Sequence, residues 1–285
     1  MLKRWACILS FVFTAFPIPA FAADNPQDKS YLKQDMEYAV YAGGINAVNA
    51  HMTLDYTQKG HYSMIFDAQT RGFLGSLVPW EGIFESQGWA LPDGQRIVEK
   101  HESTALWQGE KEVKTYTYSK EEGFQNLVTL YTHKKPRTED IDPELTKGTT
   151  DVLTATMLVM EHLTNGGKCE GSSEIFDGKR RYALIFKPVQ YVMLPESRYN
   201  VYSGPAVECT AEVKPIAGAW YKKPRGWLSI QEQGRARGTM PTVWFAQLRD
   251  YAIVVPVRVR VKTAYGTLFM HMTHYKSGDK DLKIE

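Results

Sequence analysis

The chain has 285 residues, 43% of them apolar, with 34 Lys and Arg against 32 Asp and Glu. This length is enough for one large domain or two small ones. The nearly neutral charge argues against general nucleic-acid binding, which depends on a basic surface. Residues 214–262 are an exception, with ten Lys and Arg and two acids, so we expect one locally positive surface.

The first 22 residues have the pattern of a secretory signal. Lys3 and Arg4 precede an apolar run over residues 5–16, and Ala20-Phe21-Ala22 has the small residues that a signal peptidase recognises. The alternative, an uncleaved membrane anchor, needs about 20 apolar residues. We therefore predict cleavage after Ala22, a mature chain without a transmembrane segment, and a location in the periplasm. Without Lys3 and Arg4, the 34 basic residues become 32, equal to the 32 acidic ones.

Apolar and polar residues alternate along much of the remaining chain. Met52, Leu54 and Tyr56 alternate with polar residues, as do the valines from Val257 to Val261. A period of two is typical of half-buried β-strands. Turn residues such as Gly43-Gly44 separate these runs at short intervals. Many short strands in succession predict a β-sandwich or a barrel, either closed or open.

Residues 150–163 depart from this alternation. Val152, Thr156, Val159 and Leu163 recur at helical spacing, and Thr150 or Asp151 can cap the start. We therefore predict a mainly β fold: a large curved antiparallel sheet or open barrel, with one amphipathic helix packed on its concave face. No linker or repeat is visible, so residues 23–285 are expected to form a single β-rich domain.

Two cysteines remain after the predicted cleavage, Cys169 and Cys209. In an oxidising compartment two cysteines favour one disulfide bond. A redox-active pair is the alternative, but the chain lacks a C-x-x-C motif. We predict a structural disulfide that stabilises the fold by about 3–4 kcal/mol, because it closes a loop of about 40 residues.

Catalytic motifs are absent from the sequence. There is no G-x-S-x-G, no phosphate-binding G-x-x-x-x-G-K-[ST] and no H-E-x-x-H. Glu81 and Glu85 form a possible acid/base pair, but no nucleophile accompanies them. His271 and His274 are three residues apart in an expected strand, which would place them on opposite faces. We expect neither catalytic activity nor a metal or cofactor, and keep an envelope hydrolase using Glu81 and Glu85 as a third hypothesis.

Two groups of residues suggest binding instead. Large apolar residues of segment 72–89 and two helix methionines could line an adaptable cavity, although ordinary core packing is the interpretation we favour. This candidate apolar site comprises Phe73, Trp80, Phe84, Trp89, Met157 and Met160. Arg258, Arg260 and Lys262 share one face of a predicted strand. They could meet an anionic partner, or they could simply be a solvated face that discourages edge-to-edge pairing.

Several segments in a fixed order resemble the bacterial periplasmic family catalogued as domain of unknown function 3108. They run from about Tyr38 to Tyr275 and are Tyr41-Ala42-Gly43-Gly44-Ile45, Thr70-Arg71-Gly72-Phe73-Leu74, Asp151-Val152-Leu153-Thr154-Ala155, Phe176-Asp177-Gly178-Lys179-Arg180-Arg181-Tyr182, Pro256-Val257-Arg258-Val259-Arg260-Val261 and Tyr265-Gly266-Thr267-Leu268. The resemblance implies export and a β-dominated fold with one helix, similar to the open barrels of periplasmic lipoprotein carriers. It implies no activity and no catalytic residues.

These observations lead to two main hypotheses. The first is a non-catalytic envelope protein that binds a lipid or acylated partner in an apolar site. The second is a scaffold that supports envelope integrity through contacts with other envelope proteins. A carrier should have a continuous cavity between sheet and helix, whereas a scaffold should have a filled core and an exposed apolar patch.

Overall fold

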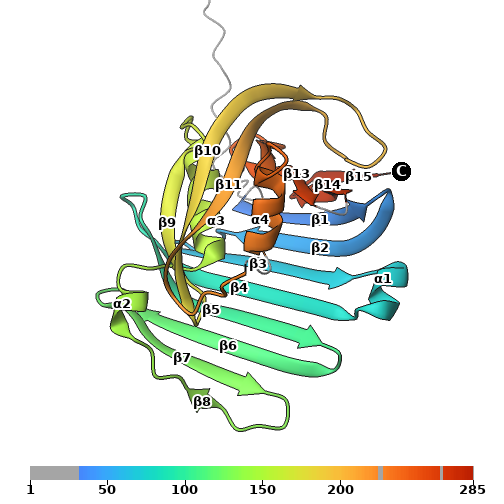
Figure 1. Ribbon diagram of the computed structural model, residues 1–285. Coiled ribbons are helices and arrows are strands. Elements are labelled where there is room, and N and C mark those ends of the chain that lie inside the picture. Colours follow the sequence, from blue (N-terminus) through green and yellow to red (C-terminus); the bar gives the residue numbers. More distant parts are fainter. Residues whose placement is uncertain (1–31, 224–226, 264–265, 285) are drawn as a thin grey trace, which may run out of the picture.

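An antiparallel sheet of 15 strands accounts for most of the residues that the structure describes (Figure 1). This computed structural model describes residues 32–223, 227–263 and 266–284, without the side chains of Phe73, Leu74 and Trp227. The predicted signal peptide, residues 1–22, therefore lies outside the described residues. No helix among the described residues is long and apolar enough to cross a membrane.

The first eight strands form a meander in which each strand pairs with the next. Their bounds are β1 (Lys33–Ala42), β2 (Ile45–Asp55), β3 (His61–Thr70), β4 (Trp80–Ala90), β5 (Arg96–Trp107), β6 (Glu110–Ser119), β7 (Gly123–Tyr131) and β8 (Arg137–Thr138). Glycines with positive φ, such as Gly43 and Gly44 between β1 and β2, make the tight reversals.

The remaining strands form a second meander, which joins the first where β14 pairs with β1. Their bounds are β9 (Gly171–Phe176), β10 (Arg180–Leu194), β11 (Gly204–Gly218), β12 (Thr242–Ala246), β13 (Val255–Thr263), β14 (Gly266–Ser277) and β15 (Lys280–Lys283). The order of paired strands ends at β8 on one side and at β9 on the other, so the sheet is an open curve. This confirms the predicted mainly β fold with a large curved antiparallel sheet.

Side chains bridge part of the opening between the two ends of the sheet. Phe176 of β9 packs edge-on against Tyr116 of β6 and Phe124 of β7, with ring centroids 6.2 and 5.5 Å apart. These residues belong to a small apolar cluster beside the main core. The sheet therefore curves until its last strand faces the strands near its other end.

The predicted helix is α3 (Val152–Thr164), and it contacts strands of both meanders: β3, β4, β5, β9 and β10 (Figure 1). Asp151 caps its start by accepting hydrogen bonds from the backbone N–H groups of Leu153 and Thr154. Three shorter helices, which the alternation did not predict, accompany it among the described residues. They are α1 (Gly72–Leu77), α2 (Pro143–Thr146) and α4 (Trp227–Arg235).

The space between α3 and the sheet is filled with side chains. Met157 and Met160 of α3 are fully buried. The strands contribute further buried side chains to the same core, including Met36, Leu54, Tyr62, Met64, Val257 and Met272. Such packing provides the hydrophobic stabilisation of the fold.

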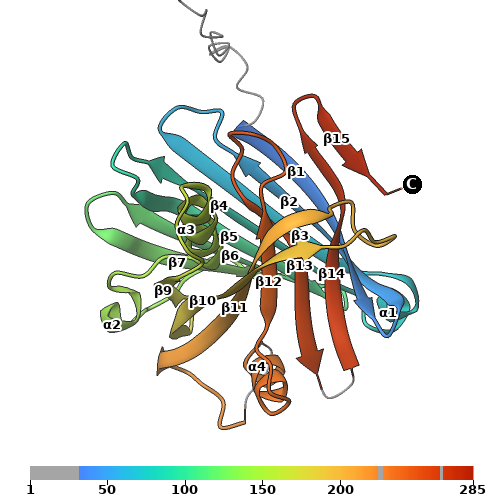
Figure 2. The same cartoon turned by 90° about the horizontal axis from the view of Figure 1, so that it is seen from above.

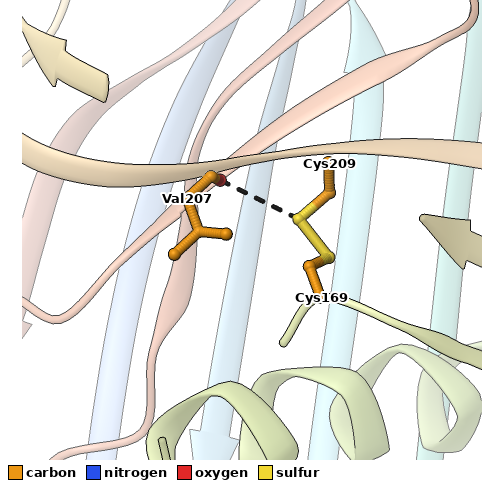
Figure 3. Close-up of a disulfide and its surroundings, with 3 residues drawn as sticks. All are labelled: Cys169, Val207 and Cys209. Carbon is orange, nitrogen blue, oxygen red and sulfur yellow. Dashed lines mark hydrogen bonds between the residues drawn. A yellow bond between two sulfur atoms is a disulfide. The ribbon is translucent and has the colours of Figure 1, made fainter. Parts of the chain in front are cut away.

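The predicted disulfide is confirmed, and it joins Cys169, between α3 and β9, to Cys209 in β11 (Figure 3). The two Cα atoms are 6.1 Å apart, and both residues are fully buried. The alternation of β11 explains the position of Cys209, since Ala211 is also buried in the core. The bridge therefore ties the chain after α3 to the second meander.

The long hairpin formed by β10 and β11 extends beyond the segment that pairs with β12 and passes over β13 and β14 (Figure 2). Asn200, in the loop at its tip, donates its side-chain N–H to the carbonyl oxygen of Val257 at 2.9 Å. The backbone N–H of Val201 donates to the carbonyl of Met272 at the same distance. The hairpin tip therefore lies against strands that are more than 50 residues away in sequence.

Candidate functional site

Two arginines of β13 lie on the face of the sheet that points away from α3. Val257 and Val261 are buried on the inner side, and Arg258 and Arg260 occupy the alternate positions. Lys262, the third residue of the predicted cationic face, follows at the end of the same row and pairs in register with Thr267. The candidate site lies on this outer face of the sheet.

Aromatic rings hold both guanidinium groups. The Cζ atoms of Arg258 and Arg260 lie 5.0 and 5.1 Å from the ring centroid of Trp244 in β12. Arg258 also lies 4.9 Å from the ring of Phe269 in β14, so it is placed between two rings. Such cation–π contacts orient a guanidinium without neutralising it. We call Arg258, Arg260, Trp244, Phe269 and His271 the arginine–aromatic cluster.

Acidic groups compensate this cluster only in part. Arg260 lies 3.8 Å from Glu208 Oε1 and donates a hydrogen bond to Thr242 Oγ1 at 3.2 Å. Among the described residues no carboxylate forms an ion pair with Arg258, and its buried Nε has no hydrogen-bond partner. Burial, followed by the charge of Arg260, lowers the pKa of Arg258. An arginine nevertheless stays charged, so the cluster keeps excess positive charge.

His271 adds a polar atom without a positive charge. Burial, and then the nearby charge of Arg258, lower the pKa of its imidazole to about 4. The ring is therefore neutral at pH 7, and its buried Nδ1 has no hydrogen-bond partner among the described residues. It stacks on Phe269 with centroids 5.8 Å apart. An anion here would meet two guanidinium groups and a neutral imidazole.

The tip of the β10–β11 hairpin brings one ring and one cation to the cluster, and β1 adds a second ring. Tyr199 lies 6.0 Å from His271 and 5.0 Å from Tyr41 of β1, measured between ring centroids. Arg198 stacks on the Tyr199 ring at 4.8 Å. Sequence reasoning missed these contacts because they depend on the path of the hairpin.

The predicted separation of the two histidines is wrong, because β14 contains a β-bulge. Glu37 pairs with His274 and Tyr38 pairs with Met272, which leaves Thr273 as an extra residue. The extra residue returns His274 to the same face as His271. His274 instead contacts Glu37 at 3.2 Å and Asp281 at 2.8 Å. Among the described residues, no group of three or more His, Cys, Asp or Glu could hold a metal ion.

The five described side chains of the candidate apolar site do not lie on one face of the sheet. Met157 and Met160 are part of the core, and Trp80 and Phe84 pack beside it, half-buried. Trp89 occupies the opposite face of β4, where strand alternation places it with the exposed Glu85 and Gln87. The side chain of Phe73 lies outside the described part of the chain. The structure therefore assigns the two methionines to ordinary core packing.

Glu81 and Glu85 both lie on the outer face of β4, in register with Gln69 and Ile65 of β3. Four residues along a strand span about 13 Å. The carboxyl groups of glycosidases lie about 5–9.5 Å apart. The backbone therefore places this pair farther apart than such a reaction needs.

A buried polar network at the start of α3 contains a serine, a histidine and an aspartate. Ser86 Oγ lies 2.8 Å from His101 Nδ1 and donates to Asp151 Oδ1 at 2.7 Å. Asp151 approaches the same ring nitrogen at 3.6 Å, whereas a catalytic triad uses opposite nitrogens of the ring. Burial lowers the pKa of His101. The network connects the start of α3 to β4 and β5. Residues 86, 101 and 151 are far apart in the sequence, so no local motif predicts that they meet.

Comparisons with known proteins place the chain in a family without an assigned activity. No curated protein matches the sequence. A solved structure, the beta-barrel-like protein of domain of unknown function DUF1849 from Brucella abortus, matches with a TM-score of 0.48 and 11% sequence identity. The match covers 88% of this chain and 99% of that one. The model of a family described as "Protein of unknown function (DUF3108)" matches residues 37–273, most of the sequence, and the chain therefore belongs to the DUF3108 family.

Proposed function

We propose that this protein is exported to the periplasm and acts there without catalysis, by binding an anionic lipid or an acylated anionic partner at the arginine–aromatic cluster. The observation that carries the proposal is Arg258, held between Trp244 and Phe269 and without an ion pair to any carboxylate of the described residues, Glu208 acting on it only from a distance. A charge kept partly buried without a counterion costs free energy that a bound anion would recover.

The ligand is placed on the outer face because the inner face is filled. Met157 and Met160 are fully buried between helix and sheet, so an acyl chain there would have to displace the core. The hairpin above the cluster exposes apolar side chains instead. Tyr191 and Met193 of β10 are 77% and 72% exposed. Both are close in sequence to Gln190, whose side-chain amide donates a hydrogen bond to Glu208. Anionic and apolar parts of one ligand would then have separate surfaces.

Calorimetric titration with a short-chain lipid tests the site. Dihexanoyl phosphatidylglycerol should bind the mature protein, and dihexanoyl phosphatidylcholine, which lacks a net charge, should bind much more weakly. Arg258→Gln should weaken phosphatidylglycerol binding about tenfold to hundredfold, the value of one or two charged hydrogen bonds. Equal binding by the wild type and Arg258→Gln would place the lipid elsewhere.

Lys134→Gln is the matched control for this titration. Lys134 also stacks on an aromatic ring, with its Nζ 5.1 Å from the centroid of Tyr131, but it lies in the turn after β7. The variant removes one positive charge and one cation–π contact, whereas Arg258→Gln removes one positive charge and two such contacts, and it should bind the lipid as the wild type does. A parallel loss of binding in both variants would indicate a general charge effect.

Native mass spectrometry of protein isolated from periplasm tests export and ligand together. A mass equal to residues 23–285 is expected, with an additional lipid mass that solvent extraction releases. A chain that retains residues 1–22, or that is recovered only from the cytoplasm, would contradict the proposed location.

A scaffold that binds another envelope protein is the second candidate function. The filled core and the exposed row of Val189, Tyr191 and Met193 on β10 favour it. Crosslinking in cells should then capture a partner through β10. Tyr191→Ser with Met193→Ser should remove this partner while leaving phosphatidylglycerol binding to Arg258 intact.

A further inference from the structure

A polar groove of about 710 Å³ opens on the outer face of the sheet next to the arginine–aromatic cluster. Strands β1, β2, β3 and β14 form its floor, and the end of β15 contributes to its rim. Its side chains include the amides Asn46, Asn49 and Gln69 and the carboxylates Glu37 and Asp67. Tyr41 lines the groove and also contacts Tyr199 of the hairpin, so it connects the groove with the arginine–aromatic cluster.

The register of the sheet makes the groove and the cluster one continuous row. Gln69 pairs with Asn49, Asn49 with Ala39, and Ala39 with His271. The row continues from His271 to Arg258 and from Arg258 to Trp244. Neighbouring strands are about 4.8 Å apart, so Asn49 and Arg258, three strands apart, are separated by about 14 Å. This is the length of a short oligosaccharide.

The groove offers hydrogen-bonding groups of the kind that sugar hydroxyls need. An amide donates and accepts, as a hydroxyl does, and a carboxylate accepts from two adjacent hydroxyls. Asn46 donates its Nδ2 hydrogen to Asn49 Oδ1 at 2.9 Å, while its own buried Oδ1 has no partner among the described residues. A turn of the amide that exposed this acceptor to the groove would let a ligand hydroxyl satisfy it. Tyr41 adds a ring face against which the C–H groups of a sugar can pack.

Charge gives the two ends of the row different roles. In the groove, Asp67 lies 3.1 Å from His51, and Glu37 lies 3.2 Å from His274. Lys283 at the rim pairs with Asp281 at 3.8 Å, so the described side chains of the groove carry no excess positive charge that would hold a second anion. Excess positive charge is found at Arg258, at the other end. A ligand with one neutral end and one anionic end matches this distribution.

We infer that the groove and the arginine–aromatic cluster together form a site for a saccharide carrying an anionic group, with sugar rings against Asn46, Asn49 and Gln69 and the anion at Arg258 and Arg260. This inference rests on the proposed function, since it uses the same arginines for the anion. The saccharide is either the headgroup of an anionic glycolipid or a free phosphorylated oligosaccharide.

Titration calorimetry with trehalose 6-phosphate, trehalose and inorganic phosphate tests the inference. The phosphorylated disaccharide should bind at least tenfold more tightly than either of the others. Asn49→Ala should reduce its affinity to that of phosphate and leave phosphate binding unchanged. Arg258→Gln should weaken the binding of both phosphate and trehalose 6-phosphate. Gln87→Ala, which removes an exposed amide of β4 outside the groove, should match the wild type.

The results separate the inference from the proposed function. If phosphatidylglycerol binds through Arg258 but trehalose 6-phosphate binds no better than phosphate, the saccharide site is wrong and the proposed function stands. If phosphate and phosphatidylglycerol both fail to bind, the anion site itself is wrong. If trehalose binds as tightly as trehalose 6-phosphate, the groove and the arginine–aromatic cluster do not form one site. If trehalose 6-phosphate binds, a short-chain anionic glycolipid distinguishes the two sources of the saccharide. Tenfold tighter binding of the glycolipid identifies the ligand as a lipid headgroup, and equal affinities of the two compounds identify it as a free saccharide.

Discussion

Arg96 and Arg258 are both largely enclosed arginines, but their surroundings give them opposite effects on stability. Arg96 Nε donates to Glu161 Oε1 at 2.8 Å, and the hydroxyl of Tyr56 donates to the same oxygen at 2.6 Å. Arg258 faces rings and another arginine. One residue therefore neutralises a buried carboxylate, and the other carries a charge that Glu208 compensates only in part.

Replacing each arginine with glutamine should separate these roles. Arg96→Gln leaves Glu161 buried and uncompensated, so we expect a loss of about 3 kcal/mol in the free energy of unfolding. Arg258→Gln loses cation–π contacts but also removes a buried charge, so the change should stay within about 1 kcal/mol. Urea denaturation followed by tryptophan fluorescence measures both. A loss of about 3 kcal/mol in Arg258→Gln would mean that the cluster is structural and not a binding site.

His271 should make the protein less stable in acid. Its pKa falls from 6.5 to about 4 on folding, because burial and Arg258 disfavour the charged ring. Between these values the unfolded chain takes up a proton that the folded protein does not. The contribution of His271 to the free energy of unfolding is therefore fully present above pH 6.5 and is lost as the pH falls toward 4. The full effect of this shift is about 3 kcal/mol, which solvent screening reduces to about 1–2 kcal/mol.

His271→Phe isolates this effect from the titration of the carboxylates. Phenylalanine keeps a ring against Phe269 and Tyr199 but cannot be protonated. Urea denaturation at pH 7 should give similar stabilities for the two proteins, and at pH 4.5 the variant should be more stable by about 1 kcal/mol. The same decline with pH in both proteins would show that His271 does not titrate as described.

At the scale of elements, α3 depends on Asp151. This residue accepts hydrogen bonds from the backbone N–H groups of Leu153 and Thr154, at 2.9 and 3.0 Å, and from the hydroxyls of Thr154 and Ser86. Asp151→Ala removes the helix cap and leaves buried donors unsatisfied, so we expect a loss of about 3 kcal/mol in the free energy of unfolding. Asp151→Asn keeps an accepting oxygen and should lose less.

Asp142 is the control for this prediction, because it caps α2 on the surface. Its side chain accepts from the backbone N–H of Glu144 at 3.0 Å, an exposed contact. Asp142→Ala should therefore lose about 1 kcal/mol or less. If the two alanine variants lost the same free energy in urea denaturation, the buried network around Asp151 would contribute nothing beyond an ordinary cap.

Elements with a strong local pattern could be predicted, and those created by distant contacts could not. The capped apolar run at Asp151 identified α3, and the alternation from Val257 to Val261 identified β13. The bulge at Thr273 has no local signal, and it changed which face His274 occupies. The path of the β10–β11 hairpin depends on Asn200 reaching Val257, 57 residues later in the chain. The arginine face was therefore visible in the sequence, but the rings and the groove around it were not.

At the scale of the whole molecule, two meanders share one core. They meet where β1 pairs with β14, and Gln34 and Tyr275, 241 residues apart, form a buried hydrogen bond there at 2.9 Å. Helix α3 contacts strands of both meanders, and the disulfide joins the segment after it to β11. Contacts over such distances in sequence have no local pattern, so the alternation of apolar and polar residues indicated the fold class but not the order of strands.

A shared core should make the protein unfold as a unit, as the single-domain prediction for residues 23–285 requires. Circular dichroism and tryptophan fluorescence should report the same transition midpoint in urea. Two separated transitions would mean that the meanders unfold independently and that the single-domain prediction is wrong.

The Cys169–Cys209 bridge should raise the stability of this unit without creating its cooperativity. It closes a loop with a sequence separation of 40, and constraining the unfolded chain over that length is worth about 3–4 kcal/mol. Cys169→Ser with Cys209→Ser should lower the free energy of unfolding by that amount and keep one transition, since β1, β14 and α3 still connect the meanders. Mature protein denatured without reductant should contain no titratable thiol, and finding two would show that the bridge does not form. If the double variant instead unfolds in two steps, the disulfide, and not the packed core, is what holds the two meanders together.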